Sequence, residues 1–230
     1  VERMLPFADV YITDWRDARN VPMSEGTFDL DDYVDYLVGW LEHIGPGAHM
    51  LAVCQPSVPS YAAACLMAAD KHPARPRTLT MMGGPIDTRA APTAVNTLAT
   101  ERPIGWFEQN VVATVPFNYP GSADATKKFY EEYRSVCDMT AEFYLQTVSE
   151  VFQKHSLPKG ELMHRGRLVD PAALKDIGIL AIEGERDDIS GLGQTKAALT
   201  IATNLPDSHK KYYMAESVGH YGIFNGSKWR

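Results

Sequence analysis

Cysteine is scarce in this sequence, and long apolar runs are missing. The 230 residues include three cysteines, an odd and small number that makes a poor disulfide framework, so a reducing compartment is expected. The longest apolar run, residues 61–69, is far shorter than the roughly 20 residues that span a bilayer. Residues 1–10 lack the basic start and long apolar centre of a secretory signal. We therefore expect a cytoplasmic protein with no membrane span.

Positive charge is also in short supply. Lysine and arginine number 22 against 29 aspartates and glutamates, which gives a formal net charge of -7. A nucleic-acid partner would favour a basic patch, so this balance argues against one. Most histidines show no metal-ligand spacing, namely His43, His49, His72, His155, His164 and His209. We predict neither a metal ion nor an organic cofactor.

The chain does contain an alternation of short apolar segments and helical patterns. Its length and its hydrophobic content of 45% suit one compact domain, residues 1–230. Strands are predicted at residues 9–15, 48–53, 78–82, 177–182 and 211–215. Helices are predicted at residues 29–44, 55–70 and 193–205. This alternation predicts the α/β class, with a mostly parallel sheet flanked by helices.

The middle of the chain, approximately residues 103–167, breaks this alternation. Apolar residues there recur at helical spacing, which indicates a long helix or a helical pair. The strand pattern resumes only at residue 177. We therefore expect an all-helical insertion that forms a cap over the carboxyl edge of the sheet.

Three chemically active side chains follow predicted strands. Cys54 stands between a strand and a helix, Asp187 follows the next-to-last strand, and His220 follows the last one. Open α/β sheets place their sites at the carboxyl ends of strands. The chain order of nucleophile, acid and histidine is the order found in α/β-hydrolases. The pattern predicts that His220 takes the proton of Cys54 while Asp187 orients the imidazole.

The turn at Cys54 favours a reactive sulfur. A sharp strand-to-helix turn lifts the side chain clear of the sheet and places it near a helix N-terminus, which stabilises a thiolate. The backbone N–H of Gln55 is the predicted oxyanion donor.

Two neighbouring residues are rivals for these roles. Ser57 could be the nucleophile, but it falls inside the helix after Pro56. Asp188 could be the acid, but the hydrolase arrangement Gly-x-x-Asp-x-Ile at residues 184–189 favours Asp187. The remaining cysteines are Cys65 and Cys137. Both lie in helical patterns and are predicted to fill the core or the surface, without a catalytic role.

Several motifs are long enough to be specific. Residues 52–59 read Ala-Val-Cys-Gln-Pro-Ser-Val-Pro, and residues 183–191 read Glu-Gly-Glu-Arg-Asp-Asp-Ile-Ser-Gly. Further motifs lie at residues 9–15, 28–36, 82–89, 141–148 and 218–222. Together they resemble the intracellular poly(3-hydroxybutyrate) depolymerases over nearly the whole chain.

The resemblance implies a function for these residues. It implies a Cys–Asp–His triad of Cys54, Asp187 and His220 that cleaves ester bonds of stored polyhydroxybutyrate through an acyl-thioester. The implied partner is the polymer or its granule surface, and the protein would be associated with storage granules in the cytoplasm. An apolar polymer would contact exposed cap residues, and the candidates are Trp106, Phe107 and Phe117. Simple packing within the cap is the alternative role for these aromatic residues.

Two other classes of function remain open. Cysteine also serves in the related polymer synthases, so an acyltransferase that builds polymer from acyl-CoA is one alternative. A non-catalytic granule-binding protein on a hydrolase scaffold is the other. Formation of polymer from 3-hydroxybutyryl-CoA would indicate the first, and granule binding without turnover would indicate the second.

The sequence departs from relatives at two points, and these generate a prediction about length. The nucleophile segment reads Ala-x-Cys-x-Pro, not the Gly-x-Ser-x-Gly of lipases. The resembled family also carries an earlier strand and loop that supply the second oxyanion donor, an element absent from these residues. We expect the native chain to be longer. An intact mass well above 25.5 kDa would support this expectation, and a matching mass would contradict it.

Overall fold

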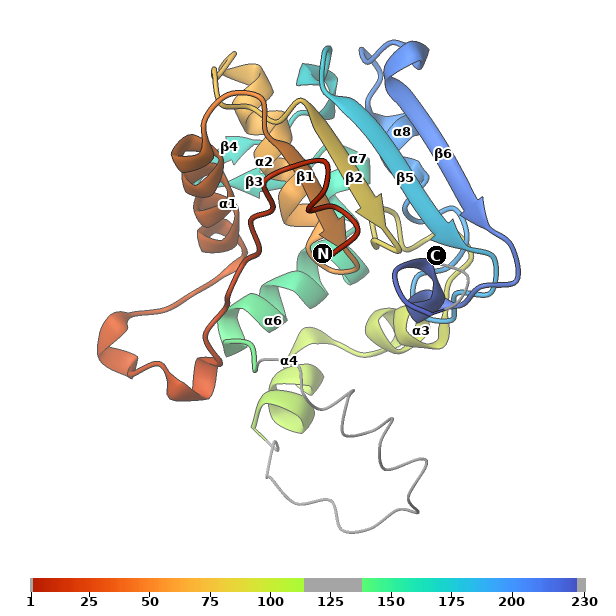
Figure 1. Cartoon of the computed structure of the whole chain (residues 1–230). Coiled ribbons are helices and arrows are strands. Elements are labelled where there is room, and N and C mark those ends of the chain that lie inside the picture. Colours follow the sequence, from red (N-terminus) through yellow and green to blue (C-terminus); the bar gives the residue numbers. More distant parts are fainter. Residues whose placement is uncertain (1, 114–137, 227–230) are drawn as a thin grey trace.

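The computed structural model describes residues 2–113 and 138–226, and a four-stranded parallel sheet lies at its centre (Figure 1). The strands lie in the order β1-β2-β5-β6, and each pairs in parallel with its neighbour. They are β1 (His49–Val53), β2 (Thr78–Met82), β5 (Gly178–Gly184) and β6 (Lys210–Ala215). The predicted parallel α/β class is confirmed, and the carboxyl ends of all four strands meet at one edge.

Helix α1 (Leu30–Ile44) begins where the sequence predicts. The side chain of Asp29 accepts a hydrogen bond from the backbone N–H of Asp32, and the side chain of Asp32 accepts one from Asp29. This capping box satisfies two backbone donors that the first helical turn leaves unpaired. The helix ends at Gly45, whose φ of 91° is left-handed backbone that glycine adopts without strain. The capping residue at the start and the glycine at the end are both visible in the sequence, which explains why this helix was predictable.

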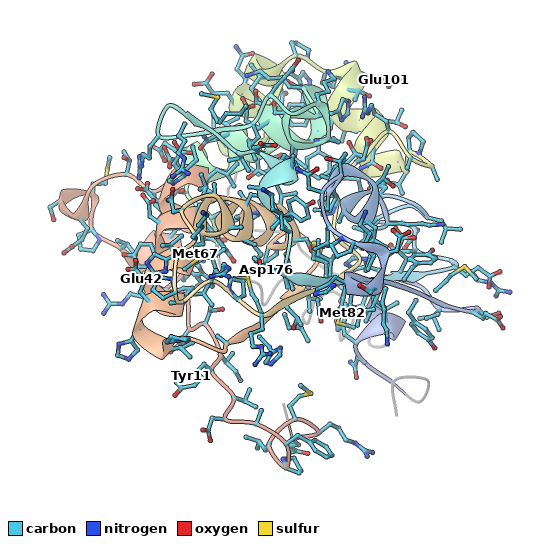
Figure 2. All side chains as sticks on the ribbon, turned by 90° about the horizontal axis from the view of Figure 1, so that it is seen from above. Tyr11, Glu42, Met67, Met82, Glu101 and Asp176 are labelled. Atoms are coloured by element: carbon cyan, nitrogen blue, oxygen red, sulfur yellow. The ribbon has the colours of Figure 1, made fainter. Side chains whose placement is uncertain are left out.

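Helix α2 (Ser57–Ala69) follows β1 after a short turn and is buried around most of its circumference. The phenol of Tyr61, fully buried, donates a hydrogen bond to the carbonyl of Ala198 at 3.0 Å. Figure 2 labels Met67 near the end of α2, where it packs with Leu41 of α1. The helix that follows Cys54 is thus held by contacts on several sides.

Helical segments lie between β2 and β5, and α3, α4 and α6 gather beyond the carboxyl ends of the strands (Figure 1). The segments are α3 (Ala94–Glu101), α4 (Ile104–Phe107), η3 (Glu108–Val112), α6 (Ala141–Thr147), η4 (Val148–Gln153) and α7 (Ser156–Lys159). An antiparallel hairpin follows, made of β3 (Met163–His164) and β4 (Arg167–Leu168). The prediction of an all-helical insertion is therefore wrong at its end. Left-handed backbone at Arg165 and Gly166 turns the chain back on itself there and forms the hairpin.

The remaining helices are short. Helix α8 (Ala197–Ile201) covers only part of the predicted 193–205, because the Glu183 carboxylate binds the N–H groups of Gly193 and Lys196 in a preceding turn. The 3-10 helices are η1 (Ala18–Asn20), η2 (Met23–Glu25), η5 (Pro171–Ala173), η6 (Asp207–His209) and η7 (His220–Ile223). In the described ranges, every helix is too short or too polar to span a bilayer.

One face of the sheet is open in the described part of the chain. Figure 1 shows α2, α7 and α8 behind the sheet, with only the N-terminal segment and η7 on the viewer's side. On this side Leu51 of β1 is 54% exposed and Tyr213 of β6 is 60% exposed. Parallel sheets are usually covered on both faces, so this open face is unusual.

The predicted strand at residues 9–15 is wrong. This segment forms no strand, and the side chains of Tyr11 and Ile12 are 67% and 65% exposed. Figure 2 shows Tyr11 at the edge of the molecule. Its β-branched and aromatic composition suits a strand, but a strand is stable only when a neighbour pairs its backbone. Trp15 anchors the segment instead, packing on Tyr33 with ring centroids 4.6 Å apart.

We predict that Tyr61→Phe lowers the free energy of unfolding by about 1–2 kcal/mol, because the carbonyl of Ala198 loses its buried donor. Urea unfolding followed by circular dichroism measures this. Tyr11→Phe on the exposed N-terminal segment is the matched control and should change the free energy little. Equal effects of both substitutions would show that the buried hydrogen bond contributes nothing measurable.

Candidate functional site

Cys54 lies in a strained turn directly after β1. Its φ of 65° falls in the left-handed region, which costs a non-glycine residue about 1–3 kcal/mol. The backbone N–H of Cys54 donates to the carbonyl of Met82 at 2.7 Å, and the N–H of Ser57 donates to the carbonyl of Cys54 at 3.0 Å. These bonds tie the turn to the end of β2 and to the start of α2. The side chain of Cys54 is partly exposed, as a nucleophile must be.

Two glycines after β2 leave room for this turn. A Cβ on Gly84 would lie 2.1 Å from Oγ of Ser57 and 3.3 Å from the carbonyl oxygen of Cys54. A Cβ on Gly83, whose φ is 59°, would lie 2.9 Å from Cε1 of His220. The Gly-Gly-Pro motif at residues 83–85 is thus more than a turn signal, because it lets the turn at Cys54 and the side chain of His220 approach the same strand end.

His220 and Asp187 form a buried pair at the adjoining strand ends. Nδ1 of His220 lies 2.7 Å from Oδ2 of Asp187, and the histidine is 5% exposed. The other carboxylate oxygen accepts hydrogen bonds from the N–H groups of Ile189 and Ser190 at 2.9 and 2.8 Å. These bonds fix the carboxylate, which in turn fixes the imidazole. Because Nδ1 is engaged by Asp187, Nε2 remains for the side chain of Cys54.

The environment of His220 favours its protonated form. Burial by itself would lower the pKa of His220, but hydrogen bonds to Asp187 and Cys54, together with the negative charges of both, raise it to about 10. A protonated imidazole beside Cys54 is the partner that a thiolate requires. The arrangement therefore suits a thiolate–imidazolium pair.

The rival residues occupy different surroundings. Ser57 is fully buried in the first turn of α2, facing Gly84, so its hydroxyl does not face solvent. Asp188 is exposed, whereas its neighbour Asp187 is buried and bound to His220. Cys65 is 1% exposed and burial raises the pKa of its thiol, which is typical of a core cysteine. Cys137 lies outside the described residues.

Two residues that support the turn were not singled out from the sequence. Thr195, fully buried, donates from its hydroxyl to the carbonyl of Gly84 at 2.9 Å and accepts from the N–H of Gly84 at 2.8 Å. Glu183 lies at the end of β5 and is 1% exposed. Its carboxylate accepts hydrogen bonds from the N–H groups of Gly193 and Lys196 and so holds the turn that carries Thr195. The signal that could have found Glu183 is a carboxylate at the end of an apolar strand.

The aromatic candidates of the cap differ in exposure. Phe107 is 3% exposed and packs with Ala99 and Val148, so it belongs to a small core among the helical segments between β2 and β5, which contradicts an exposed polymer contact. The physical reason is that α4 turns this side chain toward η4. Trp106 is partly exposed and lies edge-on to Phe107 with ring centroids 5.2 Å apart. Phe117 lies outside the described residues.

Metal ligands do not cluster in the described part of the chain. Residues 2–113 and 138–226 hold no group of three or more histidine, cysteine, aspartate or glutamate side chains that could bind a metal ion.

We predict that His220 stays protonated well above neutral pH. Its folded pKa of about 10 exceeds the ordinary value of 6.5, so protonation stabilises the fold fully below pH 6.5, and this contribution is lost as pH rises to about 10. Nitrogen NMR of the imidazole should show an imidazolium at pH 8. Cys54→Ala removes two interactions that favour the charged ring, so it should lower the titration midpoint. A neutral ring at pH 8 in the unaltered chain would contradict this prediction.

Comparison with known proteins agrees with the fold. Monoacylglycerol lipase of Paleococcus ferrophilus has a TM-score of 0.51 at 12% identity, and the match covers 89% of this chain and 71% of the lipase. BpoC of Mycobacterium tuberculosis H37Rv has a TM-score of 0.50 at 13% identity, covering 90% of this chain and 73% of BpoC. At such identities the likeness shows the fold alone. No curated protein matches the chain in sequence.

A family match extends over more than half of the chain. The family described as "PHB de-polymerase C-terminus" matches residues 83–124 and 122–230. Asp187 and His220 lie within these residues, whereas Cys54 lies before them. The chain belongs to this family of PHB depolymerase C-terminal sequences, and its fold is that of the α/β-hydrolases.

Proposed function

We propose that the chain hydrolyses ester bonds of poly(3-hydroxybutyrate), with Cys54 as nucleophile, His220 as acid and base, and Asp187 as the residue that orients His220. The observation that carries this proposal is the buried His220–Asp187 contact of 2.7 Å beside a cysteine held in a left-handed turn. Family membership supports the polymer as substrate.

The first half of the reaction forms an acyl-thioester. The sulfur of Cys54 attacks the ester carbonyl carbon, its proton having passed to Nε2 of His220, and the carbonyl oxygen becomes an oxyanion. The bond between carbon and the alcohol oxygen then breaks, and the imidazolium of His220 gives its proton to the leaving alcohol. The pKa of His220, raised to about 10, supports this order because it favours a ring that carries a proton at neutral pH.

The second half releases the acid. Nε2 of His220 takes a proton from water, whose oxygen attacks the thioester carbonyl carbon. The carbon–sulfur bond breaks, and Cys54 leaves as a thiolate that again faces an imidazolium. Asp187 stays ionised throughout and holds Nδ1 of the ring.

The oxyanion needs donors aimed at the position where charge develops. We assign one donor to the backbone N–H of Gln55, which follows the nucleophile and stands just before α2. The N-terminal end of α2 adds a positive dipole at this position. These groups stabilise the oxyanion and the thiolate alike.

The helical segments between β2 and β5 are proposed to act as the cap, approximately residues 103–167. Their place beyond the carboxyl ends of the strands supports this role (Figure 1). Trp106 remains a proposed contact for the polymer, since it is partly exposed. The reaction would then take place at the surface of a polymer granule.

We predict that Cys54→Ala abolishes release of soluble 3-hydroxybutyrate from amorphous polyhydroxybutyrate granules, because no acyl-thioester can form. Cys65→Ala is the matched control; it removes a buried thiol far from catalysis and should retain most of the release. Mass spectrometry of the rapidly quenched protein should find 3-hydroxybutyryl units attached to Cys54. Equal release from Cys54→Ala and the unaltered protein would exclude Cys54 as the nucleophile, and polymer formation from 3-hydroxybutyryl-CoA would indicate a synthase.

A further inference from the structure

A narrow apolar crevice lies beside the proposed oxyanion donor. Its wall on the core side includes Gln55, Val58 and Pro85, and its wall on the cap side includes Phe143 and Thr147. Gln55 directly follows Cys54, and Pro85 follows the two glycines that make room for the nucleophile turn. An acyl group whose carbonyl oxygen binds the N–H of Gln55 would therefore have this crevice next to it.

One polar atom in the crevice has no hydrogen-bond partner among residues 2–113 and 138–226. Thr147 is 4% exposed, and its Oγ1 makes no hydrogen bond in the described part of the chain. Buried hydroxyls are normally hydrogen-bonded, and one that is not requires an explanation. The crevice is too narrow for a water molecule as it stands, so water does not supply the partner there. A ligand that carries an acceptor oxygen would supply this partner.

The backbone at Thr147 is also irregular. Helix α6 ends at Thr147, and the chain continues at once as the π-helical segment η4. The bond from the N–H of Lys154 to the carbonyl of Ser149, at 2.9 Å, shows this wider turn. Such π-helical turns within helices are frequent at functional sites. The orphaned hydroxyl and the π turn are independent features that fall on neighbouring residues.

The crevice wall on the cap side is joined to the core by two contacts. Helix α6 lies below the carboxyl ends of the strands (Figure 1), and Oε1 of Gln146 accepts a hydrogen bond from the N–H of Leu30 at 2.8 Å. The ring of Phe143 stacks on Tyr33 with centroids 5.4 Å apart. Entry of an acyl group into this crevice would require α6 to move away from α1 at these contacts.

We propose that this crevice is the subsite for the acyl unit at the scissile ester, and that Thr147 donates a hydrogen bond to the oxygen on carbon 3 of that unit. The proposal rests on the proposed function. It names the class of substrate as short aliphatic acyl groups with a hydroxyl or ester oxygen at carbon 3. The apolar lining holds the carbon chain, and the single hydroxyl distinguishes a 3-oxygenated acyl group from a plain one.

The test compares two p-nitrophenyl esters, 3-hydroxybutyrate and butyrate, with the unaltered chain and with Thr147→Val. The substitution keeps the shape and removes the hydroxyl. We expect kcat/KM for the 3-hydroxybutyrate ester to fall about tenfold, while kcat/KM for the butyrate ester changes less than twofold. Thr147→Ser retains the hydroxyl and should retain the preference. Thr97→Val, on the exposed side of α3, is the control and should change neither value.

The outcomes separate this proposal from the proposed function. If the unaltered chain cleaves both esters and Thr147→Val lowers both equally or neither, the Thr147 subsite is wrong and the hydrolase proposal stands. If the unaltered chain cleaves neither ester, or if Cys54→Ala cleaves them equally well, the proposed function fails and the subsite fails with it. A gain in thermal stability of Thr147→Val without any change in ester preference would show that the orphaned hydroxyl is only a packing defect.

Discussion

The left-handed backbone of Cys54 is the constraint on which the rest of the site depends. A cysteine does not adopt a φ of 65° without strain, so its surroundings must hold it there. The parallel register brings the end of β2 next to it, where the carbonyl of Met82 accepts its N–H. Buried helix α2 fixes the other side of the turn. The strain is thus balanced by packing and hydrogen bonds that only the assembled sheet supplies.

Two buried carboxylates at the end of β5 and in the loop after it have separate tasks. Asp187 faces inward to His220 and sets the proton position for the proposed chemistry. Glu183 faces the turn before α8, which presents Thr195 to both backbone groups of Gly84. Since Gly84 borders the turn at Cys54, Glu183 supports this turn through three successive contacts. The first carboxylate binds His220, and the second holds the shape of the turn.

Sequence patterns predicted the parts of this molecule in which local signals and burial agree. The capping residue Asp29, the apolar strands and the position of Cys54 at a strand end were all recognisable. The segment at residues 9–15 was misjudged because its composition is that of a strand although no neighbour pairs with it. Phe107 was misjudged because a helical pattern does not say which way an aromatic ring of a small cap will turn.

Patterns along the chain were enough to establish the α/β class, the order of Cys54, Asp187 and His220, and the acidic balance of charge. Strand periodicity and residue order are local properties, so one sequence suffices to establish them. Packing between distant segments established that Nδ1 of His220 meets Asp187, that Gly84 must lack a side chain, and that the Thr147 hydroxyl has no partner within the described residues. These are contacts between residues far apart in the chain, and they exist only once the strand ends and the cap helices are packed together.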